Sequence, residues 1–217
     1  MIVKKYATGP LDVNTYVLID ENTKKAALID VGGKIKEIMS DLQKDGYKAE
    51  FILNTHGHFD HVFGEKEAQD LYNLPVYIHS KDKPLVEHLK EQIMMWGMPE
   101  VQPPEITKTF EDGDVIELGN LKIKVLHTPG HTPGGVGFYC ENTLFSGDSL
   151  FYHSIGRTDL PLGNHKDLIN SVKEKFLSLP DDTRVLPGHE TESTIGDEKI
   201  NNEFLIYDSK PDPNIFP

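Results

Sequence analysis

Residues 55–61 read Thr-His-Gly-His-Phe-Asp-His, which places three histidines and one aspartate within positions 56–61. The apolar run 51–53, Phe-Ile-Leu, comes shortly before them and predicts a buried strand. The cluster therefore begins where a strand ends, a place where loops commonly carry functional side chains. A lone histidine is mostly a hydrogen-bonded core or surface residue, but a purely structural role does not explain this density. We interpret four of these residues as metal ligands: His56, His58, Asp60 and His61.

Three further candidate ligands lie in loop-like surroundings. His131 belongs to a His-Thr-Pro-Gly-His-Thr-Pro-Gly-Gly segment, His189 to Leu-Pro-Gly-His-Glu, and Asp148 follows the apolar run 143–145. Imidazole nitrogens and carboxylate oxygens suit Zn²⁺, Fe²⁺ and Mn²⁺. The oxygen atoms of Asp148 can bridge two cations. We expect structural roles for the remaining five of the ten histidines, among which His127 would support the loop of His131; these are His79, His88, His127, His153 and His165.

Composition argues against several classes of partner. The formal net charge of −13 speaks against nucleic acid, which would require a basic patch. The single cysteine, Cys140, excludes an intramolecular disulfide and is expected to be an ordinary strand residue. The N-terminal apolar stretch is too short for a signal peptide, and no apolar run approaches the roughly 18–20 residues that span a bilayer. We expect a cytoplasmic protein with no membrane or nucleic-acid partner, and the sequence leaves its oligomeric state open.

The order of the expected elements predicts the fold class. Helices are expected near 35–42, 65–72, 83–91 and 166–177, and the proline-containing stretch 94–104 is expected to be irregular. Strands are expected at 16–20, 26–30, 51–53, 76–78, 115–118, 121–126, 136–139, 143–145 and 184–186. A β-rich segment with helices is thus followed by another. The pattern predicts one α+β domain over residues 1–217, with two packed sheets and helices outside.

The stretch 55–61 resembles the Thr-His-x-His-x-Asp-His signature of the metallo-β-lactamase superfamily, and the resemblance extends from residues 14–16 to 194–199. His131, Asp148 and His189 fall, in order, where that superfamily carries its remaining ligands. The resemblance implies an αββα sandwich of two mixed sheets, with the metal site at one edge between them. It also implies two divalent ions, zinc in the first place and iron or manganese as alternatives. One ion would be held by His56, His58 and His131, the other by Asp60, His61 and His189, with Asp148 bridging.

Within the superfamily the chain is most similar to glyoxalase II, the hydroxyacylglutathione hydrolases, and in particular to their short bacterial forms. This likeness implies hydrolysis of a small-molecule thioester by a metal-bridging hydroxide, with Asp60 as the catalytic residue that orients the water and takes its proton. Classical β-lactamases of the superfamily carry cysteine where this chain has Asp148. We therefore expect no membership of the antibiotic-degrading branch.

Residues 154–159 also resemble the short glyoxalase-II-like group, and they contain two charged residues with two open interpretations. Arg157 either pairs with Asp159 to brace the turn, or its planar guanidinium binds a carboxylate of the substrate. The full-length enzymes end in a helical domain that supplies basic residues for glutathione, whereas this chain stops at Pro217. We therefore expect recognition to depend mainly on the metals and Arg157, with tolerance of other thiol carriers.

Three alternatives remain open. Persulfide dioxygenases are similar to this chain, including a Gly-Arg-Thr-Asp segment, but use one Fe²⁺, for which His56, His131 and Asp148 would be the ligands. The segment 187–190, Pro-Gly-His-Glu, is closer to the hydrolase pattern. Another hydrolase of the same fold is the second alternative. The third, a non-enzymatic metal-binding module, is the weakest, because structural metal sites are usually closed.

Overall fold

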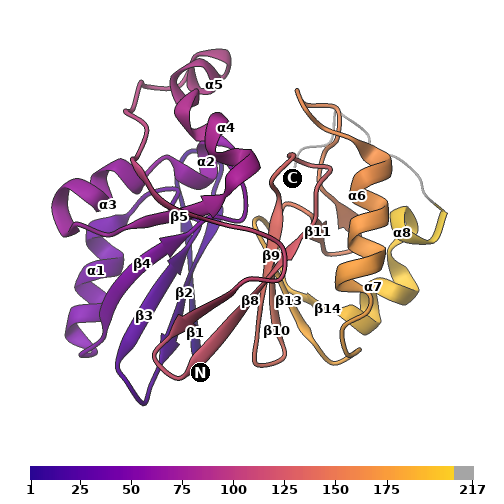
Figure 1. Ribbon diagram of the computed structural model, residues 1–217, viewed down its shortest axis with the longest axis horizontal. Coiled ribbons are helices and arrows are strands. Elements are labelled where there is room, and N and C mark those ends of the chain that lie inside the picture. Colours follow the sequence, from indigo (N-terminus) through magenta and orange to yellow (C-terminus); the bar gives the residue numbers. More distant parts are fainter. Residues whose placement is uncertain (208–217) are drawn as a thin grey trace.

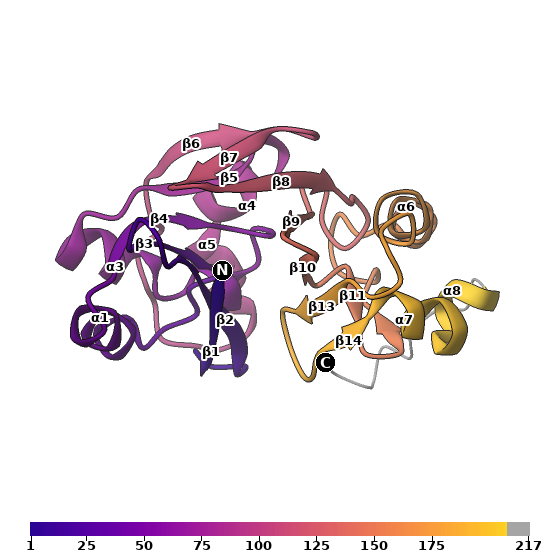
Figure 2. The same ribbon diagram turned by 90° about the horizontal axis from the view of Figure 1, so that it is seen from below.

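The structure is a computed structural model that describes residues 1–207, so residues 208–217 of the predicted domain lie outside the description. Two six-stranded sheets pack face to face, and helices cover the outer surface of each sheet (Figures 1 and 2). This arrangement confirms the predicted αββα sandwich. No helix among the described residues is long and apolar enough to cross a membrane.

The first sheet contains the N-terminal strands in sequence order. They are β1 (Ile2–Thr8), β2 (Val13–Asp20), β3 (Lys25–Ile29), β4 (Lys48–Leu53), β5 (Val76–His79) and β6 (Ile106–Phe110). From β3 to β6 the neighbouring strands run parallel. The connections carry α1 (Ile35–Lys44), α2 (Phe59–Val62) and α3 (Glu65–Tyr72). Because parallel neighbours end at the same edge of a sheet, residues that follow β3 and β4 come together.

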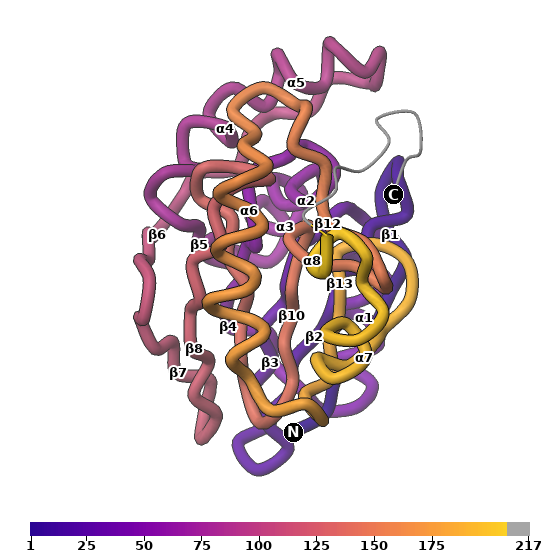
Figure 3. The backbone as a smooth tube through the Cα atoms, turned by 90° about the vertical axis from the view of Figure 1, so that its right-hand side faces the viewer, coloured from indigo at the N-terminus to yellow at the C-terminus, as the bar shows by residue number. Residues whose placement is uncertain are grey.

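The second sheet contains the later strands in the order β14-β13-β10-β9-β8-β7. Their bounds are β7 (Val115–Leu118), β8 (Leu121–His127), β9 (Val136–Cys140), β10 (Thr143–Gly147), β13 (Arg184–Pro187) and β14 (Ser193–Thr194). A small hairpin of β11 (Leu150–Phe151) and β12 (Ser154–Ile155) follows β10. Helices α6 (His165–Ser171), α7 (Ile195–Asn201) and α8 (Glu203–Tyr207) cover this sheet (Figure 3). Strands β10 and β13 are parallel, so their following residues also share an edge.

The main core lies between the two sheets. All residues of β2 are buried, and its alternate side chains Tyr16 and Leu18 face the second sheet, whereas Val17 and Ile19 pack against the helices. The Tyr16 ring contacts Phe145 of β10 edge to face, with 5.4 Å between the ring centroids. Because both faces of this sheet carry apolar side chains, one face is covered by the second sheet and the other by helices.

Cys140 is buried in the same core, at the end of β9. Burial raises the pKa of its thiol to about 11, so it is protonated at neutral pH and not a nucleophile. The prediction of an ordinary strand residue is confirmed.

Two predicted helices differ from the observed ones. The helix expected at 83–91 is broken at His88 into α4 (Lys83–Glu87) and α5 (Leu89–Met95), so the irregular stretch begins only at Trp96. The ring of His88 bonds the carbonyl of Pro84 at 2.8 Å, and the chain then turns to pack Leu89 into a separate cluster. The helix expected at 166–177 ends as an α-helix at Ser171 and continues as a wider π-helical turn, Val172–Phe176.

Several elements were not predicted because they are short or carry little apolar pattern. They are β1, β6, β11, β12, β14, α2, α7 and α8. In β1 the side chains are mostly half-exposed, which is usual for an edge strand and leaves a weak sequence signal.

Candidate metal centre

The first sheet brings four of the predicted ligands to one edge. Ile29 of β3 pairs with Leu53 of β4 in parallel register, so the residues after both strands leave the sheet side by side. The loop after β4 carries His56 and His58, and the short helix α2 carries Asp60 and His61.

The second sheet supplies the other three ligands at the facing edge. His131 lies in the loop between β8 and β9, Asp148 follows β10, and His189 follows β13. All seven predicted ligands are therefore together, and their ligand atoms form overlapping triads in which the atoms lie within 4.8 Å of one another. The triads are His56, His58 and His131; His56, His61 and Asp148; and Asp60, His61 and His189.

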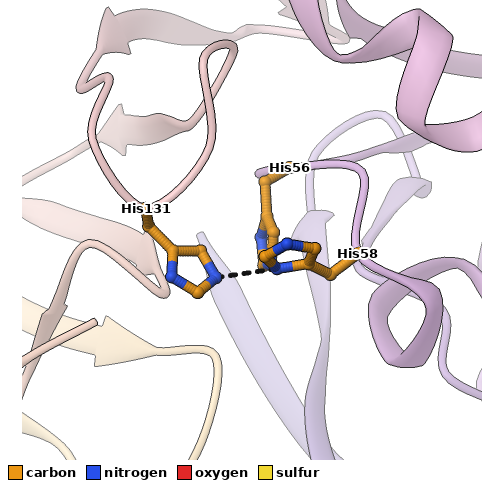
Figure 4. Close-up of side chains that lie close together, drawn as sticks. All are labelled: His56, His58 and His131. Carbon is orange, nitrogen blue, oxygen red and sulfur yellow. Dashed lines mark hydrogen bonds between the residues drawn. The ribbon is translucent and has the colours of Figure 1, made fainter. Parts of the chain in front are cut away.

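The first triad consists of three imidazoles that converge from two loops (Figure 4). Nδ1 of His58 lies 2.9 Å from Nε2 of His131. The ring of His56 is 4.8 Å from each of the other two rings, measured between centroids. His56 and His131 are 1% and 4% exposed, so water is largely excluded from the inner side of the group.

The triad of Asp60, His61 and His189 lies beside the first triad, and Asp148 lies between these two groups. Nε2 of His189 is 3.2 Å from Oδ2 of Asp60, and Nε2 of His61 is 3.6 Å from the same oxygen. Oδ1 of Asp148 is 3.2 Å from Nε2 of His61, while its Oδ2 is 3.6 Å from Nε2 of His131. The carboxylate of Asp148 thus faces both triads, which is the position of a bridging ligand.

The buried polar atoms of this cluster fit metal ions. Nε2 of His56, Nε2 of His61 and Oδ1 of Asp148 are buried and have no hydrogen-bond partner in the structure. Buried polar groups nearly always have a partner, and leaving one without costs about 1–3 kcal/mol. Cations between the triads would satisfy all three atoms at once.

The protonation states also suit metal binding. Burial lowers the pKa of His56 well below its usual range and that of His58 to about 3, so both rings are neutral. Burial opposes ionisation of Asp148, but the positive charges on His61 and His189 hold its pKa well below the usual range. Neutral imidazole and ionised carboxylate are the forms that bind metals. His61 and His189 are the exceptions. Burial opposes protonation of both rings, but Asp148, Asp60 and Asp30 outweigh burial and raise the pKa of His61, and Asp148 and Asp60 raise that of His189.

Asp30 is a residue of the site that the sequence reasoning missed. Its Oδ2 lies 3.0 Å from Nδ1 of His61, and its carboxylate accepts hydrogen bonds from the backbone N–H and hydroxyl of Thr55, at 2.8 and 2.7 Å. The bond to Nδ1 leaves Nε2 of His61 for a metal and fixes the ring. The available signal was an aspartate that ends an apolar strand.

Asp82 is a second missed residue, and the sequence offered no signal for it. Its buried carboxylate accepts bonds from the backbone N–H of Gly57 (2.9 Å), the hydroxyl of Thr132 (2.6 Å) and the backbone N–H of Gly134 (2.5 Å). Gly57 lies between His56 and His58, and Thr132 follows His131. Asp82 therefore ties together the two loops that carry the first triad.

His79 and His127 confirm their expected structural roles. Their rings stack with 4.3 Å between centroids, and Nε2 of His127 lies 2.9 Å from the carbonyl of Pro133. His127 thus supports the loop that carries His131. The ring of His131 itself donates from Nδ1 to the carbonyl of Arg157 at 2.8 Å.

A pocket opens over the cluster and reaches five of the ligands: His58, Asp60, His131, Asp148 and His189. Arg157 also lines it. The guanidinium of Arg157 makes two bonds to the carboxylate of Asp159, Nε–Oδ1 at 3.0 Å and Nη2–Oδ2 at 2.8 Å. The predicted ion pair is confirmed, and a contact between Arg157 and substrate stays a prediction.

Known proteins resemble this chain over most of its length. The family described as the metallo-beta-lactamase superfamily matches residues 8–189. Hydroxyacylglutathione hydrolase GloC of Haemophilus influenzae is 36% identical to this chain, in an alignment that covers 87% of this chain and 91% of GloC. The probable metallo-hydrolase YqgX of Bacillus subtilis is 34% identical, and the alignment covers 93% of this chain and 96% of YqgX.

Two solved structures are also similar. The BLEG-1 B3 metallo-beta-lactamase has a TM-score of 0.87 and 36% identity, covering 94% of this chain and 99% of its own. The protein TTHA1623, in a di-iron-bound form, has a TM-score of 0.83 and 38% identity over 93% and 100%. Sequence, fold and the converging histidines agree, and the chain belongs to the metallo-β-lactamase superfamily.

Proposed function

We propose that this protein is a metal-dependent hydrolase that cleaves a thioester such as a hydroxyacylglutathione. The seven clustered side chains would hold two divalent ions, zinc in the first place, and the di-iron form of TTHA1623 supports a binuclear site with iron as the alternative. The likeness to GloC supports the thioester, and the likeness to YqgX supports the broader class of metallo-hydrolases.

Held by these side chains, two divalent ions would supply a water of lowered pKa and would polarise the carbonyl of the substrate. Asp60 would orient this water and take its proton, since its carboxylate lines the pocket and is held by His189 at 3.2 Å. Asp30 and the carbonyl of Arg157 hold the rings of His61 and His131 in place. A thiolate leaves without strong help from an acid, so no further proton donor is required.

The observation that carries this proposal is the convergence of all seven side chains beneath one open pocket. A mononuclear dioxygenase would need only His56, His131 and Asp148. Four further histidine and aspartate side chains lie beside those three, and their presence supports a binuclear hydrolase over the iron enzyme.

Hydrolysis of a β-lactam is a second candidate, favoured by the likeness to the BLEG-1 enzyme. The same centre can attack a cyclic amide carbonyl. Asp148 stands where classical β-lactamases of the superfamily carry cysteine. That this chain does not degrade β-lactams therefore stays a prediction.

The three functions separate in one set of assays on metal-loaded protein. S-lactoylglutathione should release thiol without oxygen, glutathione persulfide should cause no oxygen uptake, and a chromogenic β-lactam should remain intact. A His58→Gln variant should lose thiol release, whereas the matched His88→Gln variant should keep it, because the His88 ring bonds the carbonyl of Pro84 and is not among the described residues that line the pocket. Oxygen uptake by iron-loaded protein, or β-lactam cleavage faster than thioester cleavage, would refute the assignment.

A further inference from the structure

The pocket over the metal centre has walls of large apolar side chains. Leu85 of α4 and Met95 of α5, followed by Trp96, line the side that belongs to the first half of the chain. Leu160 and Pro161, in the loop after β12, line the opposite side. Three of these residues are remote in sequence from the other two, so the apolar character is a property of the assembled pocket and not of one segment.

The wall formed by α5 is fixed in place and not a loose flap. The side chain of Gln92 accepts a bond from the backbone N–H of Phe59 at 3.1 Å and donates to the carbonyls of Gly57 and Leu85, at 3.1 and 2.8 Å. The ring of Trp96 packs on Phe59 with 5.6 Å between centroids. These contacts join α5 to the loop that carries His58, so the wall has a set position relative to the metal ligands.

Met95 is exposed although it lines this pocket. Its exposed fraction is 76%. Large apolar side chains left in water around a site are usually covered when a ligand binds.

The pocket offers little to a substrate with several carboxylates. Arg157 is the one lysine or arginine among the described residues that line it, and its guanidinium already makes two bonds to Asp159. Glutathione would bring two carboxylates, and each charge-assisted contact to a fixed cation contributes about 1.5–3 kcal/mol. The walls instead match carbon chains, which gain free energy in proportion to the area removed from water.

We propose that the substrate of this enzyme is a thioester with an apolar chain of several carbons, which lies between Met95 and Leu160 while its carbonyl faces the metal centre. This inference rests on the proposed thioester hydrolysis. The chain can belong to the acyl group or to the thiol, and both are attached to the reacting carbonyl.

Two series of thioesters test the inference with the metal-loaded protein. In the first, acetyl, butyryl, hexanoyl and octanoyl groups are carried by N-acetylcysteamine; in the second, acetyl is carried by ethanethiol, butanethiol and hexanethiol. In one series kcat/KM should rise roughly fourfold per added methylene until the pocket is filled. The series that rises identifies the side of the carbonyl on which the chain lies.

Met95→Gln and Met94→Gln form a matched pair. Both residues lie in α5 with exposed fractions of 76% and 75%, but only Met95 lines the pocket. Met95→Gln should reduce kcat/KM at least threefold more for the longest chain than for the acetyl compound. Met94→Gln should leave both unchanged.

The outcomes distinguish the inference from the function on which it rests. If thioesters are hydrolysed but kcat/KM is independent of chain length in both series, the inference is wrong and the proposed function stands. A preference for lactoylglutathione over every long-chain compound overturns the inference in the same way. If no thioester is hydrolysed, both fall.

Discussion

Asp60 is the carboxylate that we propose acts on the attacking water. It is 5% exposed, lines the pocket and lies within 3.2 Å of His189. We expect Asp60→Asn to lower kcat by about 10²-fold or more, with a small change in KM, because an amide cannot take the proton of the water.

Steady-state kinetics checks this expectation, and metal analysis of the same preparation separates loss of an ion from loss of the base. A fully metal-loaded variant that keeps most of its turnover would exclude a catalytic role for Asp60.

Glu65 is a buried carboxyl group that takes no part in the proposed chemistry. It is 0% exposed, Nδ2 of Asn54 donates to its Oε2 at 3.2 Å, and its Oε1 has no partner in the structure. Burial raises its pKa well above the usual range, so the folded protein keeps this proton to higher pH than the unfolded chain. The stability that the protonated form contributes is complete below the unfolded pKa and is lost as pH rises through the folded pKa.

Glu65→Gln should remove this loss, because glutamine resembles the protonated acid. The unfolding free energy of wild type should fall relative to that of the variant as pH rises, by at most about 1.4 kcal/mol per pH unit. Urea unfolding at a series of pH values measures the difference, and Glu67→Gln on the exposed face of α3 is the control. Parallel curves for wild type and Glu65→Gln would contradict the prediction.

At the scale of elements, the metal loops depend on a residue outside them. Asp82, just before α4, accepts from Gly57, Thr132 and Gly134 and so holds two loops against each other. Asp82→Asn places an NH₂ group against a donor, since both of its oxygens receive hydrogen bonds from backbone N–H groups. Loss of such supporting contacts typically lowers metal affinity 10- to 100-fold, and we expect a loss in that range.

Asp20→Asn provides a matched control. Asp20 also accepts hydrogen bonds from two backbone N–H groups, those of Asn22 and Asn120, and from the hydroxyl of Thr23. It lies far from the metal centre along β2: Asn14, at the opposite end of this strand, is the residue that bonds Pro187 beside the centre. Metal titration should weaken for Asp82→Asn and not for Asp20→Asn. Equal affinities in the two variants would show that Asp82 does not position the ligands.

The same contacts explain which parts of the site the sequence could predict. His56, His58, Asp60 and His61 are adjacent in sequence, so their density alone indicated a metal site. Asp30 reaches His61 because β3 pairs with β4. Asp82 contacts the site because two loops from different sheets approach each other. Strand order and loop approach are tertiary facts that local patterns do not contain.

Among the helices, too, the sequence predicted features that depend on local pattern and missed those that depend on tertiary packing. Helix α1 was predicted because Ile35, Ile38 and Leu42 recur at helical spacing and Gly46 ends the segment in a left-handed conformation, φ +76°. The break at His88 was missed because the chain there follows the packing of Leu89 against Phe59 and Val62, not a local breaker residue.

At the scale of the whole molecule, the ligands of the proposed centre come from both halves of the sandwich. Bound ions would therefore link the two sheets as well as activate water. We expect close to two metal ions per chain, and a chelator should remove activity and lower Tm together. Each ion stabilises the fold by about 2.7 kcal/mol when its free concentration is 100 times its Kd, which corresponds to roughly 5–10 °C for a protein of this size.

Metal analysis and thermal unfolding with and without chelator measure both quantities. A stoichiometry that stays at one ion under metal-replete conditions, with full activity, would contradict the binuclear centre. An unchanged Tm after complete removal of metal would contradict the link between the sheets.

Each large sheet is built from one continuous stretch of sequence, since β1–β6 end at Phe110 and the second sheet begins at Val115. A chain cut in the turn at 111–114 would therefore give two fragments, each with a whole sheet and only part of the ligand set. We expect the fragments, when co-expressed, to copurify in the presence of metal and to separate on chelation, which size-exclusion chromatography would detect. Fragments that stay together without metal would show that the apolar interface alone suffices. The metal-dependent outcome would make the divided protein a reporter of free metal ions, with fragment reassembly as its signal.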